Sequence, residues 1–348
     1  MKTTIAILTC VIGTQLMISA GILAAPQQPA PAANANAPAP PLWAFPVAPA
    51  APRGAGGGGA AGGNRGAAAA PADNSPKTVP GSAVSLTPQQ VRDTANIPDW
   101  HPDGHPALPA IVQHGRTGVV ACGYCHLPNG QGRPENSSVA GLPAEYIVQQ
   151  MADFKAGLRK SSEARLGPQN LMVNIGKAAT DEEVKAAAEY FSKLKLKPWI
   201  RVVETNEVPK TRIAGGMFSA LEDGSKEPIG NRVIEVPEDL ERTELRDDAS
   251  GFIAYVPVGS IKKGEALVVN GGAGKTTACG ICHGTDLKGL GPVPSIAGRS
   301  PSQMARQLWD MQHGARNGPW TQLMKPVVAK LSEEDLVSIT AYLASLKP

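Results

Sequence analysis

Two copies of one pentapeptide constrain this chain more than any other feature. The segment "CGYCH" spans residues 122–126, and "CGICH" spans residues 279–283. Together they use four of the five cysteines and two of the six histidines in 348 residues. At this composition, two accidental matches to C-x-x-C-H are expected on the order of 10⁻⁶ times. The fold must therefore hold two copies of the same chemical site.

Three kinds of site compete for this pattern. A disulfide would use the two cysteines of each motif but would give the histidine no role. A Cys₄ zinc site built from both motifs leaves both histidines unexplained. Covalent haem attachment uses the whole pentapeptide, because both thiols add to the haem vinyl groups and the adjoining imidazole faces the iron. We therefore interpret the cysteines as covalent tethers of two haem c groups and the histidines as iron ligands: Cys122, Cys125, Cys279, Cys282, His126 and His283.

The N-terminus predicts export. Residues 1–25 place Lys2 before an apolar stretch that ends in small residues, as in a secretory signal peptide. The stretch is nearly as long as the roughly 20 residues that span a membrane, so an uncleaved anchor is the alternative. Because haem is attached outside the cytoplasm, both alternatives place the protein in the periplasm. Loss of the leader removes Cys10 and leaves no cysteine for a disulfide, a nucleophile or a sulfur ligand.

Residues 26–86 are dominated by Ala, Pro and Gly. Such a composition buries too little apolar surface to offset its ordering entropy, so we predict a disordered tether. Docking of Trp43 and Phe45 on a partner is the alternative to a plain linker. Order is expected to begin at Thr87, which can form a capping box with Gln90.

An internal repeat divides the rest of the chain. Adding 157 to residues 122–159 gives residues 279–316 without a gap, and apolar periodicity predicts a helix in each copy. The repeat resumes at an offset of 152, where Thr180 and Ser332 are expected to cap amphipathic helices. Identical residues meet in the first aligned block: Ala140, Gly141, Gln150, Asp153, Gly157 and Arg159 match Ala297, Gly298, Gln307, Asp310, Gly314 and Arg316.

We therefore expect a mainly α fold with helical domains at residues 87–197 and 259–348. Residues 198–258 between them contain short β-branched runs separated by Gly and Pro. This middle segment has 7 Lys and Arg against 12 Asp and Glu, whereas residues 259–348 have 10 against 6. Packing of the acidic segment on the basic domain is one interpretation, and solvated surface charge is the other. The overall charge is too even for a nucleic-acid-binding protein.

Methionine sulfur is the ligand that we expect on the open face of each iron, because it favours the reduced state and suits electron transfer. Met172 follows His126 by 46 residues, and Met324 follows His283 by 41. Both precede the closing helix, so we expect each in a loop. The other methionines at helical spacing are expected to pack against a haem or a core: Met151, Met304 and Met311.

Each half resembles a class I cytochrome c, and the pair is similar to the tandem dihaem c-type cytochromes of bacterial periplasms. The resemblance covers about residues 100–197 and 259–348, and it is carried by "CGYCH" with Met172 and "CGICH" with Met324. It implies two small helical domains wrapped around haem, each with one haem edge exposed for electron exchange. The middle segment and the N-terminal tether depart from the compact tandem type.

These features favour an electron carrier with redox proteins as partners, such as a dehydrogenase, an oxidase or another cytochrome. The alternatives are a peroxidase-like dihaem enzyme and the cytochrome subunit of a dehydrogenase complex. Two methionine ligands would leave neither iron open for catalysis, and a cysteine-ligated sulfur oxidase would need a further cysteine. An uncleaved leader would add membrane association through the N-terminus.

A few polar residues allow two interpretations each. Arg116 and Arg299 can neutralise haem propionates or carry surface charge. His114 can contact a propionate or cap a helix. His313 competes for the second iron, although its aligned residue is an alanine. The histidines of "WHPDGHP", His101 and His105, are expected to be exposed in a turn.

Overall fold

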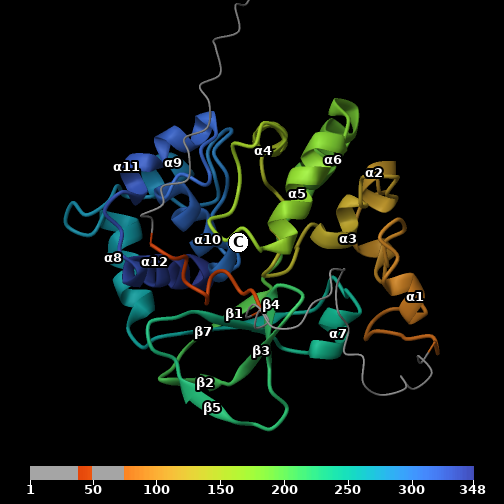
Figure 1. Cartoon of the computed structure of the whole chain (residues 1–348), viewed down its shortest axis with the longest axis horizontal. Coiled ribbons are helices and arrows are strands. Elements are labelled where there is room, and N and C mark those ends of the chain that lie inside the picture. The colour runs from red at the N-terminus through yellow and green to blue at the C-terminus, as the bar shows by residue number, and fades with distance from the viewer. Residues whose placement is uncertain (1–37, 49–73) are drawn as a thin grey trace, which may run out of the picture. The chain divides into compact units, whose positions relative to one another are not determined.

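The computed structural model describes residues 38–48 and 74–348, and Figure 1 shows two helical halves together with a middle segment of short strands. The described residues all belong to one compact unit. The leader predicted at residues 1–25 lies outside them. Within the described ranges, no helix is long and apolar enough to cross a membrane. The mainly helical fold class is confirmed.

The helices follow the order of the repeat. Those of the first half are α1 (Pro88–Val91), α2 (Ala110–Gln113), α3 (Cys122–His126), α4 (Ala144–Lys155), α5 (Gly167–Ala178) and α6 (Asp181–Lys193), with a 3₁₀ turn η1 (Pro102–Gly104). Those of the second half are α8 (Ser260–Asn270), α9 (Gly280–His283), α10 (Pro301–Gln312), α11 (Lys325–Val328) and α12 (Glu333–Ser345), with a 3₁₀ turn η2 (Pro319–Leu323).

Side-chain caps start the helices where the sequence predicts them. Thr87 caps α1 and forms the expected capping box with Gln90. Thr180 and Ser332 cap α6 and α12, and each forms a capping box followed by an acidic first turn. A cap of this kind contributes about 1 kcal/mol to helix stability. These caps fix the start of the closing helix in each half.

Each half has its own apolar core. In the first half, Phe191 and Ala187 of α6 pack with Ile175 of α5. In the second half, α8 lies against α12, and the two backbones come so close that a Cβ at Gly264 would collide with the carbonyl oxygen of Ser338. Only glycine allows this approach.

The middle segment forms three small sheets and one helix. Its elements are β1 (Ile200–Glu204), β2 (Glu207–Pro209), β3 (Thr211–Ala214), β4 (Met217–Ala220), β5 (Lys226–Pro228), β6 (Ile234–Pro237), α7 (Leu240–Glu244) and β7 (Phe252–Val256). The largest sheet has the order β1-β7-β6, with β7 parallel to β1 and antiparallel to β6. The three β-branched runs of the sequence supply its strands.

This segment contacts both halves. Glu235 of β6 is buried and accepts hydrogen bonds from the hydroxyl groups of Ser300 and Ser302 at the start of α10, at 2.7 and 2.6 Å. On the other side, Arg246 donates to the carbonyl oxygen of Tyr124 in α3 at 2.8 Å and lies over the Tyr124 ring. The acidic segment therefore packs on the second half, and it covers part of the first.

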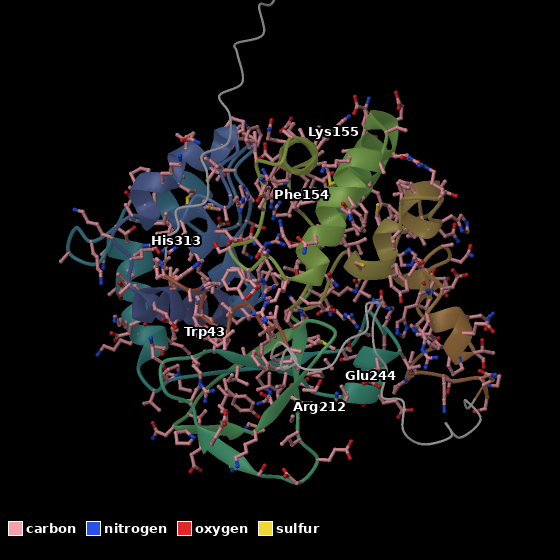
Figure 2. All side chains as sticks on the ribbon, viewed as in Figure 1. Trp43, Phe154, Lys155, Arg212, Glu244 and His313 are labelled. Atoms are coloured by element: carbon pink, nitrogen blue, oxygen red, sulfur yellow. The ribbon has the colours of Figure 1, made fainter. Side chains whose placement is uncertain are left out.

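Residues 38–48 correct the prediction of a disordered tether over residues 26–86. In this segment, which we call the strap, Trp43 and Phe45 are 5% and 0% exposed and pack in the core of the second half. The Trp43 Nε1–H donates to Glu333 at 2.7 Å, and Arg306 donates to the carbonyl oxygen of Ala44 at 2.8 Å. Figure 2 labels Trp43, which lies beside the helices of the second half. Two aromatic side chains offset the ordering entropy that the surrounding Ala and Pro residues cannot.

Residues 74–86 are a second correction to the same prediction. Lys77 and Leu86 form an antiparallel bridge, and Val79 is buried with Val91 and Trp100. The Trp100 Nε1–H donates to the carbonyl oxygen of Leu245 at 2.7 Å. The rest of the predicted tether, residues 26–37 and 49–73, lies outside the described residues, and its disorder stays a prediction.

Candidate functional site

Both pentapeptides form a single helical turn. Helix α3 carries Cys122, Cys125 and His126, and α9 with its N-terminal neighbour carries the matching residues. Each turn ends at the same aligned position with a positive φ, 63° at Leu127 and 81° at Gly284. A non-glycine residue in this conformation costs on the order of 1–3 kcal/mol and persists only where its surroundings hold it. Leu127 is buried, so packing holds the chain reversal after the first motif.

The two motif histidines are oriented in the same way. The Nδ1 atom of His126 lies 2.8 Å from the carbonyl oxygen of Ser137, and that of His283 lies 2.7 Å from the carbonyl oxygen of Pro294. Donation from Nδ1–H to a carbonyl leaves Nε2 as the free lone pair. Burial lowers the pKa of both histidines, which favours the neutral ring that an iron ligand requires.

One cavity of about 620 Å³ joins the two halves. Its lining is largely apolar and includes Met151, Phe154, Met304 and Met311 as well as the predicted site residues. The structure brings all eight of those residues to this cavity: Cys122, Cys125, His126, Met172, Cys279, Cys282, His283 and Met324. A single continuous space thus contains both motifs and both predicted methionine ligands.

The alternative of a Cys₄ zinc site is contradicted by the geometry. In the described parts of the chain, none of the four cysteines belongs to a group of three or more metal-ligating side chains with ligand atoms within 4.8 Å of one another. The four thiols are also not paired as disulfides. Burial raises the pKa of Cys122 to about 12 and that of Cys279 to about 11, so these thiols stay protonated.

Identical residues of the repeat contact one another where the two halves meet. Arg159 and Arg316 face each other in an antiparallel bridge. Each guanidinium group donates to both amide oxygens of the glutamine pair, Gln150 and Gln307, at 2.8–3.0 Å. Arg316 also donates to the hydroxyl oxygen of Tyr146 at 2.8 Å. The matches that the repeat preserves therefore build the joint between the halves.

Buried positive charge gathers at this joint. Arg159, Arg299, Arg306 and Arg316 are all buried and line the cavity. None of these four guanidinium groups forms an ion pair with a described carboxylate, taking 4.0 Å as the longest distance from nitrogen to oxygen. Burial lowers the pKa of Arg159 and Arg299 to about 10. The Nε atoms of Arg159 and Arg316 are buried without a hydrogen-bond partner.

These arginines fit the group that the sequence predicts. A buried guanidinium group is stable only when it is paired, and its planar donors match a carboxylate. The two propionates of a haem supply such carboxylates, and the apolar walls suit its ring. The cavity, the free histidine nitrogens and the unpaired donors are therefore all consistent with two haem groups that meet at the joint.

Of the other polar residues considered as haem contacts in the sequence, one lines the cavity and three do not. Arg299 lines the cavity and donates to the carbonyl oxygens of Ser138 and Ala140. Arg116 lies outside the cavity and pairs with Glu183 on the surface. His114 ends helix α2, and His313 stacks on Trp309 with ring centroids 4.1 Å apart, away from the cavity lining.

Two aspects of the site differ from the sequence prediction. Met172 lies within helix α5, so the prediction of a loop is wrong there, whereas Met324 lies in the link between η2 and α11. Pro168 in the first turn allows the helix to start early. The roles of Arg159, Arg306 and Arg316 were not predicted from the sequence. The identity of Arg159 and Arg316 in the repeat was the signal that could have identified two of them.

Comparisons with known proteins agree with this geometry. Residues 261–343 match the family described as cytochrome C oxidase, cbb3-type, subunit III. Cytochrome c4 from Azotobacter vinelandii is 26% identical over 247 residues, which cover 70% of this chain and 91% of that protein. The thiosulfate dehydrogenase electron acceptor from Thiomonas intermedia is 23% identical and aligns with 69% of this chain and 84% of its own length.

A shorter relative has a higher sequence identity to this chain than the two proteins above. Cytochrome c-554(548) from Halomonas halodenitrificans is 37% identical over 75 residues, which cover 21% of this chain and 90% of that protein. This chain contains two copies of the C-x-x-C-H motif, at residues 122–126 and 279–283. The chain therefore belongs to the c-type cytochromes, as a tandem dihaem member that carries electrons and has two covalently bound haem c groups.

Proposed function

We propose that the two haems of this electron carrier are both His/Met-ligated and lie in the one cavity between the halves. Cys122 and Cys125 hold the first haem, and Cys279 and Cys282 hold the second. The axial ligands are His126 with Met172, and His283 with Met324. The observation that carries this proposal is the single cavity that contains all eight residues.

The methionines distinguish a carrier from an enzyme. A haem iron with two protein ligands has no open position for peroxide or another substrate, and a thioether ligand favours the reduced iron. Met172 and Met324 each pack against the core of their own half, which keeps the thioether in place. We therefore favour electron transfer over a peroxidase-like reaction.

Two cytochrome domains are proposed at residues 87–197 and 259–348, with residues 198–258 as the acidic, β-containing linker segment between them. Residues 1–25 act as an export signal, because thioether attachment of haem takes place outside the cytoplasm. The protein then works in the periplasm, where its redox partners meet it.

The buried arginines should raise the midpoint potentials of both haems, because a nearby positive charge disfavours the ferric state. For Arg316→Leu we expect both potentials to fall by the equivalent of about 1 kcal/mol, taking an effective dielectric constant of about 20 and a separation on the order of 15 Å. A potentiometric titration measures the change.

Two further variants serve as controls for this titration. Arg201→Leu removes the same charge from an exposed side chain on β1 and serves as the matched control. Arg316→Lys keeps the charge and should keep the potentials. Equal shifts in Arg316→Leu and Arg201→Leu would show that the joint arginines do not act on the haems.

The second motif is the more exposed of the two. Ile281 in the second motif is 69% exposed, and Leu323 beside Met324 is 75% exposed. The corresponding Tyr124 of the first motif lies under Arg246 of the middle segment. We propose that electrons enter and leave through the second haem. A periplasmic dehydrogenase is the donor class that we favour, given the relative named thiosulfate dehydrogenase electron acceptor.

Electron self-exchange between oxidised and reduced copies of the protein tests whether electrons enter and leave through the second haem. This measurement needs no natural partner. Ile281→Glu places a charge on the apolar contact and should slow self-exchange about tenfold, measured by NMR line broadening. Because Ile281 is exposed, the introduced carboxylate stays in solvent and should not disturb the fold. The control is Val258→Glu, at a side chain that is 63% exposed in the middle segment. If both variants exchange electrons at the same rate, the second haem is not the port.

A further inference from the structure

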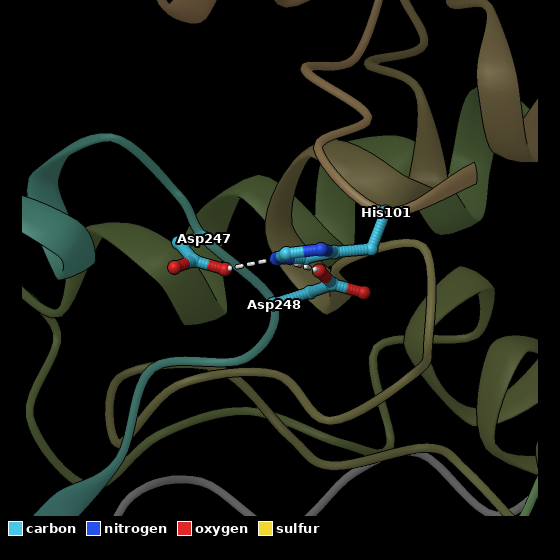
Figure 3. A group of neighbouring side chains, drawn as sticks. All are labelled: His101, Asp247 and Asp248. Atoms are coloured by element: carbon cyan, nitrogen blue, oxygen red, sulfur yellow. Dashed lines mark hydrogen bonds and ion pairs between the residues drawn. The ribbon is translucent and has the colours of Figure 1, made fainter. Parts of the chain in front are cut away.

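A second group of metal-ligating side chains lies outside the haem cavity. His101, next to η1, and the pair Asp247 and Asp248, after α7, bring one ligand atom each within 4.8 Å of one another. The His101 Nε2 atom lies 2.9 Å from Asp247 Oδ1 and 3.9 Å from Asp248 Oδ1. Figure 3 shows the imidazole ring pointing to both carboxylates. The prediction of exposed turn histidines is therefore wrong for both residues, since the side chains of His101 and His105 are 21% and 3% exposed.

The two carboxylates are buried but unequally paired. The Asp247 side chain is fully buried, and its Oδ2 atom accepts from Arg242 Nε at 2.7 Å. The Asp248 side chain is 5% exposed, and its Oδ1 atom, which faces His101, is buried without a hydrogen-bond partner. A buried carboxylate oxygen without a donor is costly. Asp248 therefore points an unsatisfied acceptor at the centre of the group.

Neighbouring cationic side chains do not balance the negative charge of both aspartates. Asp99 is already paired with His105, at 3.2 Å. Arg242 pairs with Asp247, and in the described part of the chain no lysine or arginine lies within ion-pair distance of Asp248. Two buried carboxylates therefore share one guanidinium group and one imidazole, which is an arrangement that suits a bound cation.

We propose that His101, Asp247 and Asp248 bind a divalent transition-metal ion such as Zn²⁺. One imidazole nitrogen with two carboxylate oxygens is a donor set that suits zinc, whereas calcium and magnesium prefer oxygen ligands throughout. A cavity of about 1000 Å³ reaches His101 and Asp248, so water can complete the coordination. Binding displaces the proton that Nε2 otherwise donates to Asp247.

The ion would fasten the middle segment to the turn that carries His101, next to the loop that follows the first haem motif. Asn129 in that loop donates to the carbonyl oxygen of Asp248 at 2.6 Å, and Gln131 donates to that of Ser250 at 2.8 Å. Metal binding at Asp248 therefore holds the segment that covers Tyr124. The site is structural rather than redox-active, and it is separate from the iron ligands.

Calorimetric titration of the chelator-treated, haem-loaded full chain with Zn²⁺ tests the proposal. We expect one ion per chain, and we expect the denaturation midpoint to rise with zinc concentration because the ion binds the folded state. His101→Ala and Asp248→Asn should each weaken binding at least tenfold. Asp248→Asn keeps the backbone contact to Asn129 and the side-chain shape, so loss of binding there does not reflect misfolding.

His114→Ala is the matched control, because His114 is exposed and bonds only to Asn96 in the described structure. This variant should bind zinc as the parent chain does. The proposal is overturned if the parent chain shows no saturable binding up to millimolar Zn²⁺, which would make the group a histidine clamp between two aspartates. It is also overturned if His101→Ala and Asp248→Asn bind as tightly as His114→Ala.

Discussion

Replacing Met324 by alanine should remove the methionine–iron charge-transfer band of one haem and lower that haem's midpoint potential, and Met172→Ala should do the same for the other haem. The thioether favours ferrous iron, so its loss stabilises the ferric state. We expect a decrease on the order of 0.1 V or more, within the roughly 0.8 V that axial ligands span. Absorbance during a potentiometric titration measures both effects.

Met151 and Met304 provide the matched controls for this experiment. Both line the same cavity, but they lie on α4 and α10 rather than before the closing helices. Met151→Ala and Met304→Ala should keep both charge-transfer bands and change the potentials far less. A ligand assignment is wrong if its own alanine variant keeps the parent spectrum, or if a control variant loses a band instead.

The largest effect on stability is expected in the strap. Phe45 is fully buried among residues of the second half, and removal of such a ring leaves a cavity. Phe45→Ala should lower the free energy of unfolding by about 3–5 kcal/mol. Denaturant unfolding of the haem-loaded protein measures the change. We expect the urea midpoint to fall.

Leu42 in the same strap is the control, because it is 62% exposed. Leu42→Ala should change the free energy of unfolding by no more than about 0.5 kcal/mol. If Phe45→Ala and Leu42→Ala have equal stabilities, the strap does not pack on the second half in solution. In that case the tether predicted from composition would extend through residues 38–48.

Local sequence signals predicted much of the fold. The caps at Thr180 and Ser332 depend only on neighbouring residues, and both helices start there. The alignment of the two copies also predicted which residues would share one chemical role, and all eight line one cavity. These features could be predicted because their physical causes lie within a few residues or within the repeat itself.

Features that depend on distant contacts could not be predicted. Trp43 and Phe45 lie in a segment whose composition favours disorder, and packing in the core of the second half orders them. His101 was expected in an exposed turn because its partners, Asp247 and Asp248, lie 146 and 147 positions away. The role of Arg159 emerges only when the two copies face each other across the joint.

We propose that one chain holds two His/Met-ligated haems that carry electrons. A potentiometric titration of the purified holoprotein, combined with a pyridine haemochrome assay for haem content, distinguishes this arrangement from the alternatives. We predict two covalently bound haems per chain, two one-electron steps, and a methionine–iron band from each haem in the oxidised protein. One haem per chain, or a high-spin iron without its methionine band, would contradict the claim.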